Sequence, residues 1–214
     1  MAVLKDNYIS PGSAEARQKE INDFKRILSN YFPDQKAFSG KRILNIGCGP
    51  VTEEPALNEY FSPSKLVSID NCEYRKEDAI KNNRKSFVFG DLRELEKILS
   101  EKDRFDIIIG RNVPLSPGGT GTYPGDFMRS CTDYKPVTEN DMWLGIFRKI
   151  KGFCEEKSTM FLTFLRTDEF LRAEKILEKI NYSIIKKEEN SHLCFSDGIG
   201  VAHGTKDHFI ILAQ

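Results

Sequence analysis

The chain has 214 residues, with 32 basic and 32 acidic side chains, so its formal net charge is zero. This balance excludes the long-range attraction expected of a protein that binds nucleic acid mainly through phosphates, although it leaves room for a local basic patch. A composition with 39% hydrophobic and 30% charged residues is typical of a globular protein, and the length predicts one α/β domain with additions.

The cysteines and histidines give no sign of a metal site or of a disulfide framework. Five cysteines lie far apart with no CxxC pair, and the three histidines have no acidic partner at ligand spacing. Free thiols are typical of a cytoplasmic protein, and we predict that location. No stretch of the sequence is apolar enough to span a membrane, so no membrane partner is expected.

The first predicted unit is an N-terminal arm and helix over residues 1–40. Residues 1–12 are polar and end in Pro11-Gly12, which predicts an arm or a turn. Ser13 can cap a helix that runs to about Phe32, along which apolar residues recur at helical spacing. We expect this helix to pack on an edge of the sheet rather than to bind a substrate.

A strand, a glycine turn and a helix follow in residues 41–61. The apolar run Ile43-Leu44-Asn45-Ile46 is followed at once by Gly47-Cys48-Gly49-Pro50 and then by a helix-compatible segment. This order begins a βαβ unit, whose glycines let a ligand lie against bare backbone. Asn45, at the carboxyl end of the strand, is expected to face the same crevice. A lone G-x-G pattern is weak evidence, because glycines after strands are usually only turns.

The first turn of this helix contains two acidic residues, Glu53 and Glu54. Carboxylates stabilise a helix N-terminus, but they repel a pyrophosphate that would otherwise bind there. Val51 and Thr52 also stand where the third glycine of a dinucleotide-binding fingerprint would fall. The turn is therefore predicted to hold a neutral or cationic ligand rather than a dinucleotide phosphate.

Acidic residues follow the next two predicted strands. Strand 65–69 ends in Asp70, 21 residues beyond Gly49, a spacing that lets a carboxylate accept hydrogen bonds from two ribose hydroxyls. Strand 86–89 is followed by Asp91, whose carboxylate can accept a hydrogen bond from the exocyclic amino group of an adenine. Each aspartate is also a candidate N-cap for the helix after it. These two helices are predicted over residues 72–82 and 92–99.

A fourth strand is predicted over residues 105–109, a continuous apolar run typical of a strand buried on both faces. Arg111 and Asn112 leave its carboxyl end. Because the carboxyl ends of parallel strands meet at one edge of a sheet, we expect these two residues, Asn45, the glycine turn and the two aspartates around one crevice. Each signal alone is weak, and the ordered set is much stronger.

This ordered set resembles the class I methyltransferases that use S-adenosylmethionine. Asn45 stands where the family usually has Asp or Glu, a difference expected to weaken a water-mediated hold on the ligand's ammonium group. Val51 stands where many members have a third glycine. The resemblance extends from about residue 41 to the C-terminus. The segments similar to the family's four motifs are, in order, Ile43–Pro50, Leu66–Asp70, Phe89–Leu92 and Phe105–Asn112.

The resemblance implies an enzyme with S-adenosylmethionine as cofactor and S-adenosylhomocysteine as product. It also implies a three-layer, Rossmann-like α/β sandwich whose mostly parallel, seven-stranded sheet has the order 3-2-1-4-5-7-6, with the last strand antiparallel. Cys48 is expected to be a small packing residue rather than a nucleophile. The residues predicted to bind the cofactor are Asn45, Gly47, Cys48, Gly49, Asp70, Asn71, Asp91, Leu92, Arg111 and Asn112.

The methyltransferase-like unit, assigned to residues 41–214, contains a long insert at about 113–137. Loops of this length inside a compact domain are uncommon and tend to be functional lids, so we predict a substrate lid, with a disordered surface loop as the alternative. The remaining elements are predicted as a helix from about 138 to 153, a strand over 160–165, a helix over 168–180 and strands over 182–186 and 208–213.

Three functions fit this pattern, and methyl transfer to a small-molecule acceptor is the one we favour. An NAD-dependent oxidoreductase would share the βαβ start and the position of Asp70. A non-catalytic partner protein would keep the cofactor pocket without transferring a methyl group. A nucleic-acid acceptor is less favoured, because the chain is neutral and has no added basic domain. The sequence selects no catalytic base among the possible ones, Tyr123, Asp126, Asp133 and His203.

Overall fold

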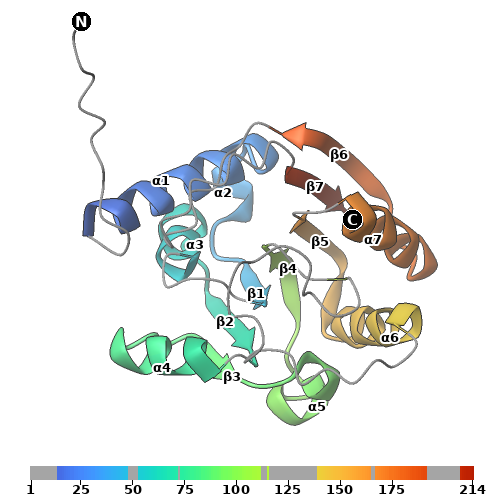
Figure 1. Cartoon of the computed structure of the whole chain (residues 1–214), viewed down its shortest axis with the longest axis horizontal. Coiled ribbons are helices and arrows are strands. Elements are labelled where there is room, and N and C mark those ends of the chain that lie inside the picture. The colour runs from blue at the N-terminus through green and yellow to red at the C-terminus, as the bar shows by residue number, and fades with distance from the viewer. Residues whose placement is uncertain are drawn as a thin grey trace, which may run out of the picture.

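The computed structural model describes residues 14–47, 53–71, 73–111, 115, 139–164, 167–191 and 208–214. Its strands are β1 (Arg42–Ile46), β2 (Lys65–Asp70), β3 (Phe87–Phe89), β4 (Phe105–Gly110), β5 (Cys154–Phe164), β6 (Ile184–Ser191) and β7 (His208–Ala213). In this part of the chain they form one sheet in the order β3-β2-β1-β4-β5-β7-β6 (Figure 1). Strands β1 to β5 run parallel to one another, whereas β7 runs antiparallel to both β5 and β6. The predicted Rossmann-like α/β fold class, strand order and antiparallel last strand are confirmed.

Helices cover both faces of the sheet (Figure 1). Successive side chains of a strand point to opposite faces, and the central strands are apolar at nearly every position, so both faces bury a core. In β1, Ile43 faces the core beneath α1 and α3, and Leu44 faces the core beneath α6 and α7. The helices are α1 (Ala14–Tyr31), α2 (Gln35–Phe38), α3 (Glu53–Phe61), α4 (Glu73–Lys81), the 3₁₀ turn η1 (Leu92–Glu94), α5 (Leu95–Ile98), α6 (Glu139–Gly152) and α7 (Thr167–Lys179).

Helix α1 lies across one face of the sheet, whereas the sequence suggested an edge. Its apolar residues share a core with β1, β4, β5 and β7, and the ring centroid of Tyr31 is 5.1 Å from that of Phe161 in β5. The apolar stripe of α1 runs along most of the helix, and a sheet face offers more apolar surface against which to bury it than an edge does. The N-terminal helix therefore packs on the same core as the strand that precedes the glycine turn.

Two strands are longer than predicted. Their added ends are rich in charged and polar residues, so no apolar pattern marked these ends in the sequence. β5 begins at Cys154, six residues before the predicted start at Met160, and β6 continues to Ser191 instead of ending at Lys186. β6 is a border strand of the sheet, and such a strand does not need an apolar sequence. The first residues of β5 precede its pairing with β7, which begins at Met160, and they are partly exposed. The helix predicted over residues 92–99 is instead η1 followed by the short α5, and α2, which Asp34 caps, was not predicted.

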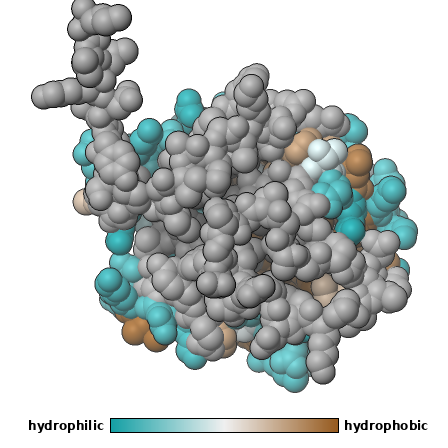
Figure 2. All heavy atoms as spheres, in the orientation of Figure 1, coloured by the Kyte–Doolittle hydropathy of each residue, from teal (hydrophilic) through white to brown (hydrophobic). Residues whose placement is uncertain are grey.

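The surface of the described residues is mainly polar. Where Figure 2 colours the surface, hydrophilic side chains dominate the rim of the face shown. Exposed large apolar side chains include Ile80 on α4 and Val88 and Phe89 on β3, the strand at one border of the sheet. None of the helices in the described ranges combines the length and the apolar character needed to cross a membrane.

Candidate functional site

The carboxyl ends of four parallel strands lie next to one another at one edge of the sheet. Ile46 of β1 is in register with Ile69 of β2 and with Gly110 of β4. Asp70 of β2 is in register with Phe89 of β3. The residues that follow these strands therefore lie around the same edge. They are Gly47 after β1, Asn71 after β2, Gly90 and Asp91 after β3, and Arg111 after β4.

Gly47 opens the turn after β1 in a left-handed backbone conformation, with φ at 58°. Residues with a side chain rarely adopt this conformation, whereas glycine does so at no steric cost. Crowding by the described residues is not the reason for glycine here, because a Cβ built on Gly47 would meet none of their atoms within 4 Å. The backbone path of the turn, rather than close packing, requires this glycine.

Asn45 is fully buried at the carboxyl end of β1, and its Nδ2 donates a hydrogen bond to Oε2 of Glu53 at 3.2 Å. Among the described residues, neither Oδ1 of Asn45 nor Oγ of Ser68, its register partner on β2, has a hydrogen-bond partner. Buried oxygens usually have a hydrogen-bond partner. These two oxygens therefore form a polar point, a small polar site within an otherwise apolar layer. This polar point lies where β1 leads into the glycine turn.

Three buried charged side chains form a cluster beside Asn45. Nη1 of Arg111 lies 3.4 Å from Oε1 of Glu20 on α1 and 3.7 Å from Oε1 of Glu53 on α3. The guanidinium also lies over the ring of Phe24, 5.5 Å from its centroid. The three charged side chains are 4% (Glu20), 3% (Arg111) and 0% (Glu53) exposed. The Glu20–Arg111–Glu53 cluster therefore joins α1, α3 and the end of β4 at the strand-end edge.

The neighbouring carboxylate, Glu54, has a different partner. Its Oε1 lies 2.9 Å from Nη2 of Arg84, and both side chains are almost fully buried. The Arg84 guanidinium also lies over the ring of Phe87, 5.1 Å from its centroid. Glu53 and Glu54 each lie against an arginine, so the repulsion of a pyrophosphate that the sequence suggested is partly neutralised.

A cavity of about 410 Å³ borders the Glu54–Arg84 pair. It lies between α1, α3 and the turn that precedes β3, and Arg17, Asn58 and Asn82 are among its lining residues. None of the strand-end residues named above lines it. This cavity is therefore separate from the candidate site.

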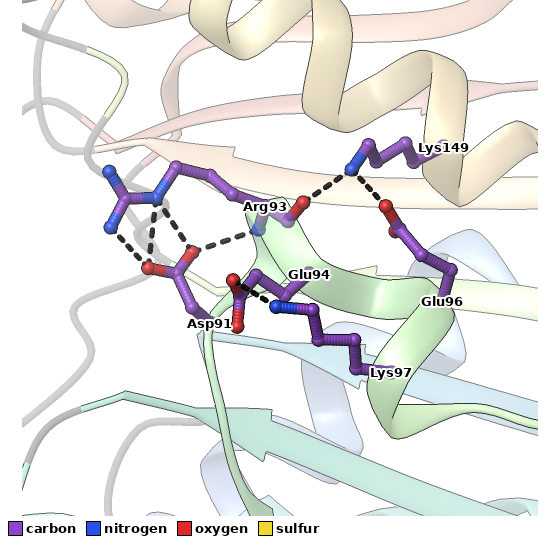
Figure 3. Close-up of polar contacts among 6 residues, drawn as sticks. All are labelled: Asp91, Arg93, Glu94, Glu96, Lys97 and Lys149. Atoms are coloured by element: carbon purple, nitrogen blue, oxygen red, sulfur yellow. Dashed lines mark hydrogen bonds and ion pairs between the residues drawn. The ribbon is translucent and has the colours of Figure 1, made fainter.

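Asp91 caps the turn η1 and is bound by the arginine two positions later. Its Oδ1 accepts a hydrogen bond from the backbone N of Arg93 at 2.8 Å, and both carboxylate oxygens accept from Nε of Arg93 (Figure 3). Partial burial raises the pKa of Asp91, but the hydrogen bonds from Arg93 lower it by a larger amount. The pKa of Asp91 therefore lies below its ordinary value. Asp91 is therefore an N-cap, the second role considered for it from the sequence. An adenine amino group that bound this carboxylate would share it with Arg93.

No protein-family model matches the sequence, and no curated protein matches it. Solved structures do match. An S-adenosylmethionine-dependent methyltransferase from Clostridium acetobutylicum superposes with a TM-score of 0.59 and 11% identity over 91% of each chain. Magnesium protoporphyrin IX methyltransferase from Synechocystis, whose structure contains bound S-adenosylmethionine, gives a TM-score of 0.52 and 15% identity over 94% of this chain and 85% of that chain. The fibrillarin pre-rRNA processing protein of Methanococcus jannaschii gives a TM-score of 0.52 and 11% identity over 82% of this chain and 68% of that chain.

The chain has the fold of the class I S-adenosylmethionine-dependent methyltransferases. Within this methyltransferase fold, Asp70 and Asn71 are half-buried at the end of β2, and the carbonyl of Asp70 accepts a hydrogen bond from Gly90 N at 3.0 Å. Leu92 begins η1 and packs against the core beneath α6. Asp70, Asn71, Asp91 and Leu92 thus lie near one another, as the sequence predicted.

Several predicted residues lie outside the described part of the chain. They are Cys48, Gly49 and Asn112, the possible bases Tyr123, Asp126, Asp133 and His203, and all of the predicted lid except Leu115. Leu115 is fully buried, and the guanidinium of Arg172 donates a hydrogen bond to its carbonyl. Within the described ranges, no group of three or more His, Cys, Asp or Glu residues is placed to hold a metal ion.

Glu20 and Arg84 were not predicted as site residues, and the buried arginine partner of Glu53 was not predicted either. A signal for Glu20 was present, because it stands four and eight positions before Phe24 and Leu28, on the apolar stripe of α1. A carboxylate within an apolar stripe is buried with the helix, and a buried carboxylate needs a cationic partner. No comparable local signal marks Arg84, whose partner is 30 residues away.

Proposed function

We propose that this protein transfers a methyl group from S-adenosylmethionine to a small-molecule acceptor and releases S-adenosylhomocysteine. The observation that carries the proposal is the register of β1, β2, β3 and β4, which places Gly47, Asp70, Asp91 and Arg111 around one edge of the sheet. In open parallel sheets, ligands bind outside the carboxyl ends of the strands.

Each strand end has a proposed role toward the cofactor. Backbone groups of the turn from Gly47 to Gly49, including those of Cys48, are proposed to contact the methionine part of the ligand. Asn45, in β1 just before this turn, is proposed to hold the turn in place. Asp70 accepts the two ribose hydroxyls, and Asn71 lies beside it. The residues proposed to line the rest of the cofactor pocket, including the adenine site, are Asp91, Leu92, Arg111 and Asn112.

The residues of the described site suit a cofactor that is cationic and carries a ribose. Asp70 supplies a carboxylate at the sheet edge, and Gly47 gives the left-handed turn that exposes backbone groups. Bound S-adenosylmethionine supplies a methyl group on a positively charged sulfur, which makes the leaving group neutral. The protein then needs to hold an acceptor in line with that methyl group and to exclude water, and positioning of this kind contributes several kcal/mol. A base is needed only for an acceptor that starts protonated.

A small-molecule acceptor is proposed because the chain has zero formal net charge and no added basic domain. The structural neighbours include a porphyrin methyltransferase and a pre-rRNA processing protein, so the fold itself accommodates both kinds of acceptor. We further propose a cytoplasmic location, the division into residues 1–40 and 41–214, and a substrate lid at about 113–137.

The experiment that tests the proposal compares ligands by thermal shift. S-Adenosylhomocysteine is expected to raise the melting temperature of the protein, because a ligand that binds only the folded state stabilises it. NAD is expected to leave the melting temperature unchanged. A shift with NAD and none with S-adenosylhomocysteine would replace the proposal by an oxidoreductase. A shift with S-adenosylhomocysteine but no methyl transfer to a broad panel of small molecules, proteins and RNA would favour a non-catalytic partner protein.

A further inference from the structure

The cavity beside the Glu54–Arg84 pair lies outside the strand-end site, and three segments of the chain form its walls. Its volume of about 410 Å³ is within the range of small-molecule sites, which is roughly 300–1,000 Å³. Helix α1 contributes Arg17, helix α3 contributes Asn58, and the turn before β3 contributes Lys85. All three of these residues are exposed. The cavity therefore offers polar groups that a bound molecule can reach.

The wall that precedes β3 has a defined backbone. Asn83 adopts a left-handed conformation with φ at 50°, and the backbone N of Arg84 donates a hydrogen bond to the carbonyl of Ala79 at 3.0 Å, which ends α4 in an ordered turn. The side chain of Arg84 pairs with Glu54 of α3 at 2.9 Å and is 3% exposed. This buried pair joins the turn to α3, so two walls of the cavity are held together.

Two cations of the cavity, Arg17 and Lys85, have no carboxylate partner within the described ranges of the chain. Nη1 of Arg17 donates a hydrogen bond to Oδ1 of Asn82 at 3.3 Å, and this acceptor is neutral. Among the described lining residues, the one acidic side chain is that of Glu54, which lies against Arg84. The charges of Arg17 and Lys85 can therefore act on a bound anion.

We propose that this cavity is a second binding site, for a small molecule that carries a phosphate or carboxylate group together with hydroxyl groups. The guanidinium of Arg17 presents N–H donors in a planar fork that fits the oxygens of such an anion, and Lys85 adds a second positive charge. The amide of Asn58 and the hydroxyl of Ser86 can both donate and accept hydrogen bonds, which suits the hydroxyl groups of the same ligand. The proposed site is independent of the cofactor, because none of the strand-end residues described above lines the cavity.

The experiment measures binding of four probes to the full chain by calorimetry, with and without S-adenosylhomocysteine. Inorganic phosphate, glucose 6-phosphate and citrate are the charged probes, and glucose is the neutral control. Saturable binding of glucose 6-phosphate or citrate is expected, and the tighter of the two identifies the anion. S-Adenosylhomocysteine is expected to leave their Kd values unchanged, because the two sites are separate. Binding of glucose as tight as that of glucose 6-phosphate would contradict the role of the anion.

Substitutions test which side chains hold the anion. Arg17→Gln and Lys85→Gln change exposed residues, so both variants are expected to keep the melting temperature of the wild type. Arg17→Gln is expected to weaken binding of the charged probes about tenfold, because hydrogen bonds to charged groups are strong, and Lys85→Gln about threefold. Lys19→Gln on α1 and Lys81→Gln at the end of α4 are the matched controls, because each removes the same charge from an exposed residue outside the cavity lining. These controls are expected to change Kd by less than about twofold.

Three results overturn the proposal. The first is the absence of saturable binding by any charged probe at millimolar concentration. The second is a loss of affinity in Lys19→Gln and Lys81→Gln as large as that in Arg17→Gln and Lys85→Gln, which would mean that the probes respond to overall charge alone. The third is displacement of the probe by S-adenosylhomocysteine, which would place the anion at the strand-end edge. A protein that binds a charged probe but not S-adenosylhomocysteine contradicts the proposed function and leaves this site standing.

Discussion

The charged side chains at the two ends of the parallel strands differ in how deeply they are buried. At the amino ends, Arg42 pairs with Asp106 through Nε and Oδ2 at 3.3 Å, and these side chains remain 36% and 23% exposed. At the carboxyl ends, Arg111 and Glu53 are 3% and 0% exposed. Burying charges costs several kcal/mol per ion before pairing, whereas exposed pairs contribute little either way. The difference indicates that stability alone does not account for the buried charges at the carboxyl ends.

The largest expected effect is the loss of stability on replacing Arg111, at the carboxyl ends, and the same replacement of Arg42, at the amino ends, is the comparison. Arg111→Met leaves two buried carboxylates without their guanidinium, and we expect a loss of about 3–5 kcal/mol in the free energy of unfolding. Arg42→Met removes a partly exposed arginine, and we expect a loss of less than about 1 kcal/mol. Urea denaturation measures both values. Equal losses would remove the contrast between the two ends.

The second comparison concerns ligand binding by Asp70, at the carboxyl end of β2, and by Asp103, which precedes β4 and lies near the amino end of β2. Asp70→Asn is expected to weaken binding of S-adenosylhomocysteine by roughly 10- to 100-fold, because hydrogen bonds to a charged group are worth about 1.5–3 kcal/mol. Asp103, which pairs with Lys65 at the start of the same strand, provides the control. Asp103→Asn is expected to leave the affinity unchanged. Calorimetry on both variants checks this, and a loss of equal size in Asp103→Asn would contradict it.

The third comparison uses the two glycines that flank β1. Gly40 and Gly47 have φ angles of 74° and 58°, and a Cβ on either one would meet no atom of the described part of the chain within 4 Å. Replacing either glycine by alanine is therefore expected to cost about 1–2 kcal/mol of stability through backbone strain alone. Only Gly47→Ala is expected to weaken binding of S-adenosylhomocysteine as well. A binding defect in Gly40→Ala, measured beside its stability, would show that strain and not position causes the effect.

The smallest effect belongs to an exposed pair at the carboxyl end. Because the pKa of Asp91 lies below its ordinary value of 3.8, its pairing with Arg93 stabilises the fold above that pH, and this contribution is lost as the pH falls through the lowered pKa. Arg93 is 48% exposed, so Arg93→Ala is expected to cost only about 0.5 kcal/mol at neutral pH. Urea denaturation at pH 7 and at a pH below the lowered pKa of Asp91 is expected to show this difference disappearing in acid. A difference that persisted in acid would assign the effect to packing.

Much of the fold was predictable because its signals are local. The apolar run before Gly47, the left-handed turn there and the continuous apolar strand β4 are each visible within a few residues. Parallel strands then bring their ends together by geometry alone, so Asp70 and Asp91 were placed near the turn without long-range information. Strands β5 and β6 were too short in the prediction, because the first residues of β5 and the last residues of β6 are mostly charged or polar and show no apolar pattern.

The partners within the candidate site were not predictable in the same way. Arg111 was expected to line the crevice, and its guanidinium lies between two carboxylates, one of them 91 residues away in sequence. Nothing in the residues around Arg111 indicates Glu20, and only the crossing of α1 over the sheet face brings the two together. The same holds for Glu54 and Arg84, where the sequence could show two neighbouring carboxylates but not their separate partners.

The measurement that tests the central claim most directly is a calorimetric titration of the wild-type protein with S-adenosylhomocysteine, with NAD as the competing ligand. We predict saturable binding of one S-adenosylhomocysteine per chain and no heat from NAD. No binding of S-adenosylhomocysteine at millimolar concentration, or saturable binding of NAD in its place, would contradict it.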